Sequence, residues 1–183
     1  MPGPCAWLSA IRRYFAVLAV GNLLWEFAQM PLYSLWNTGT TPEIIFSAIH
    51  CTGGDMLIGT AALVGSLLVF GTSTWPNTRL LTVAIATFAV GLSYTIYSEH
   101  LNMARGAWSY SPLMPVLPGL GTGLAPLAQW LIIPLLAFAL VRLPQRNRYG
   151  EKYAAKGLDL PTMAITTSQS TPVHLAHSTR RAS

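Results

Sequence analysis

The sequence predicts an all-α membrane protein built as a bundle of four transmembrane helices. Of its 183 residues, 52% are hydrophobic and only 9% are charged, which is too apolar for an ordinary soluble domain. Four apolar runs are each long enough to cross a bilayer as a helix. They cover residues of about 14–36, 44–70, 80–101 and 118–141.

The basic residues predict the orientation of these helices. Arg12 and Arg13 precede the first run, Arg79 lies between the second and third, and Arg142 follows the fourth, whereas Arg105 alone lies on the opposite side. The positive-inside rule therefore predicts a multi-pass protein of the bacterial inner membrane with both termini cytoplasmic. The net charge of +5 is explained by attraction to anionic headgroups, so we expect the lipid bilayer, and no nucleic acid, as a partner.

The same pattern divides the chain into three parts. We expect a short cytoplasmic lead-in at 1–13, a transmembrane domain at 14–144 and a cytoplasmic tail at 145–183. The tail is basic at first and then rich in Ser and Thr without an apolar period, which predicts disorder.

The first run carries a polar stripe. At about 100° per helical residue, Asn22, Glu26, Gln29 and Tyr33 fall within an arc of about 60°. Glu26 is expected near the membrane midplane, where a charged side chain costs on the order of 2.5–3.5 kcal/mol. The stripe should therefore face protein or a wet cavity rather than lipid.

The second run places His50 and Asp55 on the two flanks of a face that also holds Gly54. We expect both side chains to border one groove. Gly53 and Gly54 would let another helix or a ligand approach the backbone, and the alternative is that they form only a packing notch.

Polar residues also mark the third and fourth runs. Glu99 and Asn102 share an arc near the outer end of the third run, with His100 beside it, although a helix end entering the headgroup zone would show the same residues. Gln129 is expected at mid-membrane depth in the fourth run. The aromatic loop 105–115 is either a lid over the bundle or an anchor in the headgroups.

Three of the six acidic residues, Glu26, Asp55 and Glu99, thus fall inside or at the edge of the predicted spans without a basic partner. Such groups should be protonated, or neutralised by His or a metal ion. They are our candidate acids and bases in a pocket in the outer half of the bundle. The candidate ligand-binding residues around them are Asn22, Gln29, Tyr33, His50, Tyr94, Asn102, Gln129 and Trp130.

Several functions fit such a pocket, and the sequence identifies no cofactor. An apolar cavity with few polar groups suits an amphiphilic small molecule such as a lipid, isoprenoid or sterol-like compound, which the protein would bind or process. Alternatives are a metal or haem site with ligands from His50, His100, Asp55 and Glu99, and a proton- or ion-coupled transporter subunit that works as a homo-oligomer. A third alternative is a polar network that only fastens the helices together or docks a partner protein.

Two resemblances accompany these patterns. The segments 98–102, 106–111, 114–115 and 126–130 resemble a signature of small uncharacterised bacterial inner-membrane proteins, which implies no activity. Glu26-x-x-Gln29-x-Pro31, followed by Pro42 to Ser47 and His50, resembles part of the EXPERA group, which includes sterol isomerases and the sigma-2 receptor. That resemblance implies a cavity for a sterol-like amine or lipid with Glu26 and Asp55 as its acids.

Overall fold

The computed structural model describes residues 4–142 and confirms the all-α four-helix bundle. Four helices, each long and apolar enough to cross a membrane, make up this part of the chain. Two short helical segments follow the first of them. In chain order the elements are α1 (Pro4–Gln29), η1 (Met30–Leu32), α2 (Leu35–Thr38), α3 (Thr41–Phe70), α4 (Leu80–Ala104) and α5 (Leu124–Val141).

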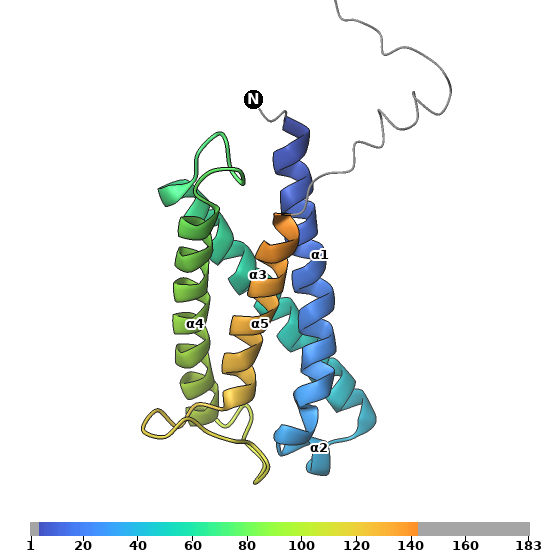
Figure 1. Cartoon of the computed structure of the whole chain (residues 1–183). Coiled ribbons are helices and arrows are strands. Elements are labelled where there is room, and N and C mark those ends of the chain that lie inside the picture. The colour runs from blue at the N-terminus through green and yellow to red at the C-terminus, as the bar shows by residue number, and fades with distance from the viewer. Residues whose placement is uncertain (1–3, 143–183) are drawn as a thin grey trace, which may run out of the picture. The chain divides into compact units, whose positions relative to one another are not determined.

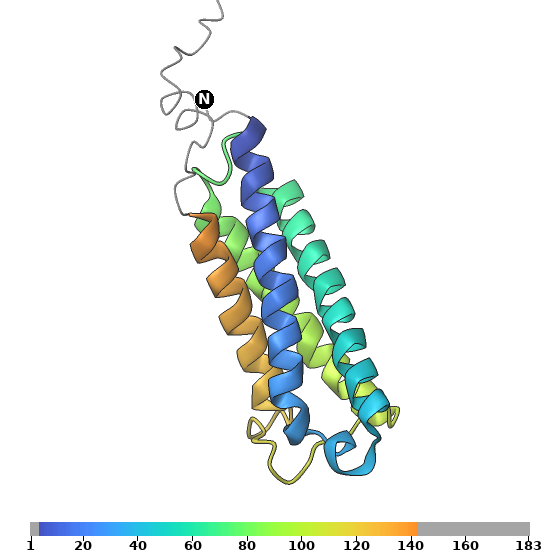
Figure 2. The ribbon, with the colours of Figure 1, turned by 90° about the vertical axis from the view of Figure 1, so that its right-hand side faces the viewer.

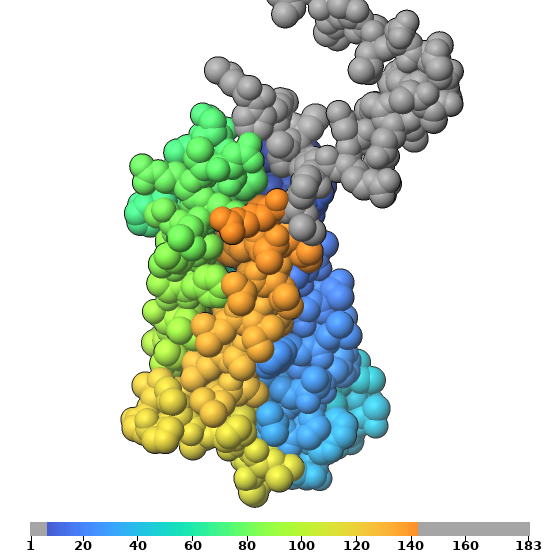
Figure 3. Space-filling view, viewed as in Figure 1, coloured from blue at the N-terminus to red at the C-terminus, as the bar shows by residue number. Residues whose placement is uncertain are grey.

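The long helices pack in a ring in which each contacts two others. α1 packs against α3 and α5, and α4 packs against the same two helices from the other side. Figures 1 and 2 show the resulting up-and-down arrangement, in which successive long helices run in opposite directions. On the face seen in Figure 3, the side chains of α5 lie between those of α1 and α4.

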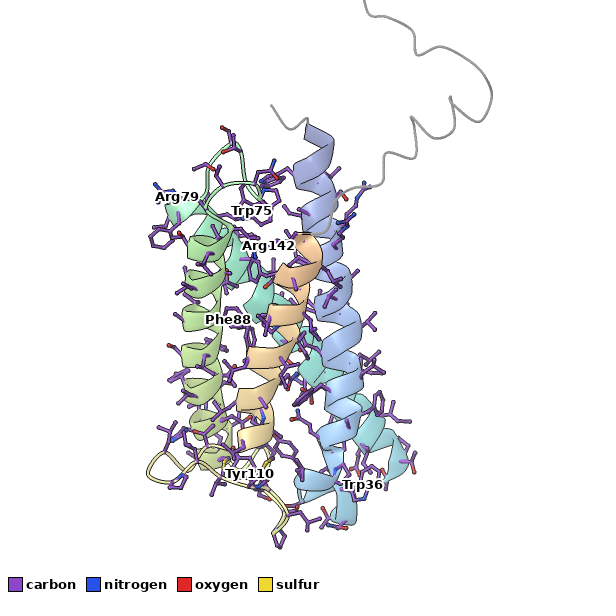
Figure 4. All side chains as sticks on the ribbon, viewed as in Figure 1. Trp36, Trp75, Arg79, Phe88, Tyr110 and Arg142 are labelled. Atoms are coloured by element: carbon purple, nitrogen blue, oxygen red, sulfur yellow. The ribbon has the colours of Figure 1, made fainter. Side chains whose placement is uncertain are left out.

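The bundle has two different ends. The Arg79 end carries the start of α1, the connection 71–79 and the end of α5, and Figure 4 shows Trp75, Arg79 and Arg142 there. The long-loop end carries the connections 30–40 and 105–123, and Figure 4 shows Trp36 and Tyr110 at this end. Every basic residue of the described part except Arg105 therefore lies at or near the Arg79 end.

Apolar packing and polar contacts occupy different halves of the bundle. The hydrophobic core, which includes Tyr14, Leu18, Leu63, Val83 and Phe138, fills the half nearer the Arg79 end. Large apolar side chains on the outside of all four long helices are exposed, as expected for a surface that contacts lipid. The buried carboxyl and amide groups lie in the other half.

Three element boundaries differ from the prediction. α1 begins at Pro4 rather than at about residue 14, because proline is readily accepted in the first turn, so residues 4–13 are helical and not a separate lead-in. It also ends at Gln29, since Pro31 cannot continue an α-helix and lies in the 3-10 turn η1. α5 begins at Leu124 rather than at about 118.

Glu26 lies three residues before the end of α1, roughly 5 Å along the helix axis. Its depth near the membrane midplane stays a prediction. The predicted tail at 145–183 lies outside the described residues. α3 starts as expected, with Thr40 and Glu43 forming a reciprocal capping box at its first turn.

The long-loop end is closed by contacts between segments far apart in the sequence. Leu32 and Ser34 exchange backbone hydrogen bonds with Ser109 and Ser111, each 2.9 Å long. The Ser34 and Ser109 hydroxyl oxygens lie 2.6 Å apart. The connection 105–123 is therefore tied to the end of α1 rather than hanging free in the headgroup zone.

Candidate functional site: a buried carboxyl and amide network

The polar stripe of α1 faces the inside of the bundle, as predicted. Asn22, Glu26 and Gln29 are 4%, 4% and 5% exposed, whereas their helix neighbours Leu24 and Phe27 are 66% and 42% exposed. A helix with one polar face and three apolar faces in lipid is most stable with that polar face against protein. The stripe therefore fixes the rotation of α1 about its own axis.

Gln129 of α5 connects this stripe to α3. Its Nε2 donates to Asn22 Oδ1 at 3.1 Å, Glu26 Oε1 at 3.1 Å and Asp55 Oδ2 at 2.7 Å. Gln29 Nε2 in turn lies 2.9 Å from Glu26 Oε1 and 3.3 Å from Gln129 Oε1. Five side chains from three helices thus form one network, which we call the amide–carboxyl network.

The amide–carboxyl network has more acceptors than donors. The amides of Gln29 and Gln129 hold four N–H hydrogens but make five contacts, two and three respectively. The buried Gln29 Oε1 has no hydrogen-bond partner among the described residues. A group that brought additional hydrogen-bond donors would satisfy these atoms.

Glu26 and Asp55 also interact directly with each other through their carboxyl groups. Among the described residues, no arginine contributes to the surroundings of either group. Two carboxyl groups that meet in an apolar environment without a cation are most stable when they share a proton. This pair is therefore able to give up or receive one proton.

Glu99 belongs to a second cluster, beside the long-loop end. It is 6% exposed and accepts a hydrogen bond from the hydroxyl of Tyr110 in the connection 105–123. The same hydroxyl accepts the backbone N–H of Gly123 at 2.9 Å. His100, in contrast, is exposed and bonds to Ile96 O in its own helix at 3.0 Å.

Tyr33 and Cys51 lie between the two clusters. The Tyr33 ring packs edge-on against Tyr110 with 5.6 Å between the ring centroids, and its phenol interacts electrostatically with both Glu26 and Glu99. Burial, and after it Glu99, raises the pKa of Tyr33 above its ordinary value. Cys51 interacts electrostatically with all three carboxyl groups. The three acids predicted from the sequence therefore occupy one region of the bundle.

The structure does not bring every candidate residue to this region. His50 is exposed and stacks on Phe46 with 5.6 Å between the ring centroids, so it does not border a groove with Asp55. Tyr94 is 48% exposed and packs against Tyr97. Asn102 bonds to Ser98 in its own helix. Trp130, in contrast, is buried against Gly91 of α4, and its side chain hydrogen-bonds to the Asp55 carboxyl group of the network.

Within residues 4–142, no three His, Cys, Asp or Glu side chains are arranged as ligands of a metal ion. His50 and His100, two members of the alternative ligand set, are both exposed.

Sequence reasoning missed the roles of Tyr110 and Cys51. Tyr110 was expected as part of a lid or as a headgroup anchor, because nothing in its sequence neighbourhood predicts a partner on α4. Cys51 shares a helical face with Gly54, and this period was the signal that could have placed it beside Asp55.

No protein-family model, curated protein or solved structure matches this chain. The function of the amide–carboxyl network must therefore be inferred from its own geometry.

Proposed function

We propose that this protein binds an amphiphilic small molecule in the membrane, with the polar end of the ligand at the Glu26–Asp55 pair. The observation that carries the proposal is the acceptor-rich amide–carboxyl network, which is buried on α1 and α5 but partly exposed at Asp55 on α3. A purely structural network would be expected to satisfy its own acceptors, whereas Gln29 Oε1 has no partner in the described part.

The surroundings of Asp55 leave room for a ligand. A Cβ added at Gly53 or Gly54 would meet no heavy atom within 4 Å. Cys51, Gly54 and Asp55 are all partly exposed. A molecule dissolved in the bilayer would therefore reach Asp55 from the side, without first leaving the membrane.

The amide–carboxyl network also indicates which chemical groups the ligand should carry. Because it offers free acceptors and a shared proton, the polar end of the ligand should donate hydrogen bonds, as a hydroxyl group does. The rest of the ligand should be apolar, since the helices beside Asp55 carry large exposed apolar side chains. A lipid, an isoprenoid or a sterol-like compound has this character.

A chemical step is compatible with the same residues. A carboxyl pair that shares one proton serves as a general acid or base when a reacting atom lies within hydrogen-bond reach. Glu26 and Asp55 would then be the catalytic pair, with Glu99 as a further acid at the long-loop end.

We further propose that the protein lies in a bacterial inner membrane with both termini in the cytoplasm. The described arginines lie mostly at the Arg79 end, which would be the cytoplasmic end. The long-loop end, and with it the site, would then face the outer leaflet.

The test is to purify the full chain in mild detergent and identify by mass spectrometry the organic molecules that accompany it. The parent should retain a defined amphiphile that Asp55→Asn and Glu26→Gln lose while remaining monodisperse. Glu43→Gln is the matched control, since it removes an exposed carboxylate and keeps a residue type suited to the capping box. Equal retention by all four proteins would contradict the proposal.

A further inference from the structure

A groove at the Arg79 end is independent of the amide–carboxyl network. It has a volume of ≈ 340 Å³ and is lined by Phe70 at the end of α3 and by Leu81, Thr82, Ile85 and Ala86 on the first two turns of α4. It is shallow and open to the surface. Its lining is apolar except for Thr82.

The groove is shaped by side chains of unequal size. Leu81 and Ile85 are 70% and 60% exposed and stand along one side, while Thr82 and Ala86 are small, half-buried and one turn apart. From Leu81 to Ala86 the helix rises roughly 7–8 Å. The groove therefore begins where the helices end and continues along the span, which is the path of an acyl chain below its headgroup.

Arg79 lies directly before α4, two residues before Leu81 of the groove lining. Its side chain is exposed, and the connection 71–79 contains no acidic residue. The four acidic residues of the described part all lie elsewhere, on α1, α3 after Thr40, and the far end of α4. The positive charge of Arg79 is thus not compensated by a carboxylate of the connection.

The connection that ends at Arg79 is held by packing and hydrogen bonds. Trp75 is 1% exposed and packs edge-on against Trp7 with 6.1 Å between ring centroids. The hydroxyls of Thr72, Thr74 and Thr78 bond to one another at 2.6–3.1 Å. Arg79 itself has φ of 61°, a left-handed conformation that Gly or Asn adopts more readily. The backbone conformation therefore gives no reason for an arginine at this position.

We infer that this groove is a binding site for one anionic phospholipid. The phosphate group would pair with the Arg79 guanidinium, which presents several donors in a plane, and one acyl chain would lie over Thr82 and Ala86 between Leu81 and Phe70. Charge complementarity selects this occupant: a zwitterionic lipid would fill the groove equally well but would present a phosphate already neutralised by its own cation.

The test uses the full chain in mild detergent with a one-to-one mixture of phosphatidylglycerol and phosphatidylcholine of the same acyl chains. Native mass spectrometry counts the lipids of each kind that remain bound. The parent should retain one phosphatidylglycerol in preference, and Arg79→Gln should reduce that preference about fivefold, the effect expected for one arginine near a membrane surface. Arg105→Gln, at the long-loop end, is the matched charge control and should leave the preference unchanged.

A second pair of variants tests the groove. Ala86→Phe fills it and should reduce the retention of both lipids, whereas Ala61→Phe adds the same ring to an exposed site on α3 and should not. If Ala86→Phe does not fold, Ala86→Leu replaces it. Equal retention of the two lipids by the parent, or equal loss in Arg79→Gln and Arg105→Gln, would overturn the inference.

Discussion

The Tyr110 hydroxyl joins the connection 105–123 to a carboxyl group of α4, because it donates to Glu99 and accepts the Gly123 N–H at the same time. One phenol therefore fixes both the middle and the end of this connection. The backbone contacts of Ser109 and Ser111 with the end of α1 hold its other side.

Tyr110→Phe should loosen this connection and destabilise the fold by about 1 kcal/mol, the usual net effect of a lost hydrogen bond. Burial, and after it the neighbouring Glu99, raises the pKa of Tyr110 above its ordinary value. A group whose pKa is raised by folding contributes fully below its unfolded pKa. The stability difference between parent and variant should thus stay constant up to about pH 10 and shrink above it.

Unfolding in detergent at a series of pH values measures this difference. Tyr97→Phe is the control, since Tyr97 is 60% exposed and should contribute little at any pH. A difference that disappeared already between about pH 7 and pH 9, below the ordinary tyrosine pKa, would show that the phenol does not carry it.

Gly91 allows α4 and α5 to approach each other. A Cβ at Gly91 would lie 2.2 Å from Trp130 Cζ3, a contact that only a shift of the ring or the helix would relieve. Gly91→Ala should therefore destabilise the bundle by about 1–3 kcal/mol, as overpacking does. It should also displace Gln129, the neighbour of Trp130, and weaken ligand retention.

The matched control is Gly53→Ala, whose added Cβ meets no heavy atom within 4 Å. This variant should be about as stable as the parent or up to about 1 kcal/mol more stable, because alanine favours the helix. Thermal unfolding of both variants in the same detergent makes the comparison. Equal stability of the two would contradict the packing of α4 on α5.

Two substitutions of Glu26 distinguish a structural role of this residue from a functional one. Glu26→Ala removes the acceptor of the Gln29 amide in its own helix and of the Gln129 amide in α5, and should lower stability by about 1–2 kcal/mol, at about 1 kcal/mol or less for each lost hydrogen bond. Glu26→Gln retains an acceptor oxygen and should keep the stability of the parent. It cannot supply the carboxyl proton, so it should lose ligand binding. If Glu26→Gln retained both the stability and the ligand binding of the parent, the role of Glu26 would be structural only.

The proposed orientation predicts the activity of reporter fusions. Alkaline phosphatase fused after Asn37 or Ser109, at the long-loop end, should be exported and active. The same reporter fused after Asn77, in the connection at the Arg79 end, should be inactive. Activity in the reverse pattern would place the site toward the cytoplasm.

The transmembrane spans and the inward face of α1 could be predicted because both depend only on the local sequence. Four long apolar runs define the helices, and Asn22, Glu26 and Gln29 share one face at helical spacing whatever surrounds them. The proximity of Gln129 to this face of α1 followed from the depth expected for Gln129 in an up-and-down bundle.

The rotation of α3 could not be predicted in the same way. In a soluble bundle the apolar face marks the inside, but a membrane helix is apolar on its outer faces too, so its hydrophobic pattern does not say which polar residue points inward. His50 and Asp55 were therefore treated alike, but in the structure only Asp55 contacts Gln129 inside the bundle, while His50 is exposed. The partner of Glu99 depends on the path of a loop, which helical periodicity does not describe.

The order of synthesis has a consequence for the amide–carboxyl network. Glu26 and its donor Gln129 are separated by 103 residues, which a ribosome adds in about 5–20 s. α3 is made within that interval, and from then until α5 is made the Glu26 and Asp55 carboxyl groups exist without the amide that later joins them. The nascent chain therefore passes through a stage with two exposed acids in or beside the insertion machinery, and only the arrival of the last helix closes the bundle around them.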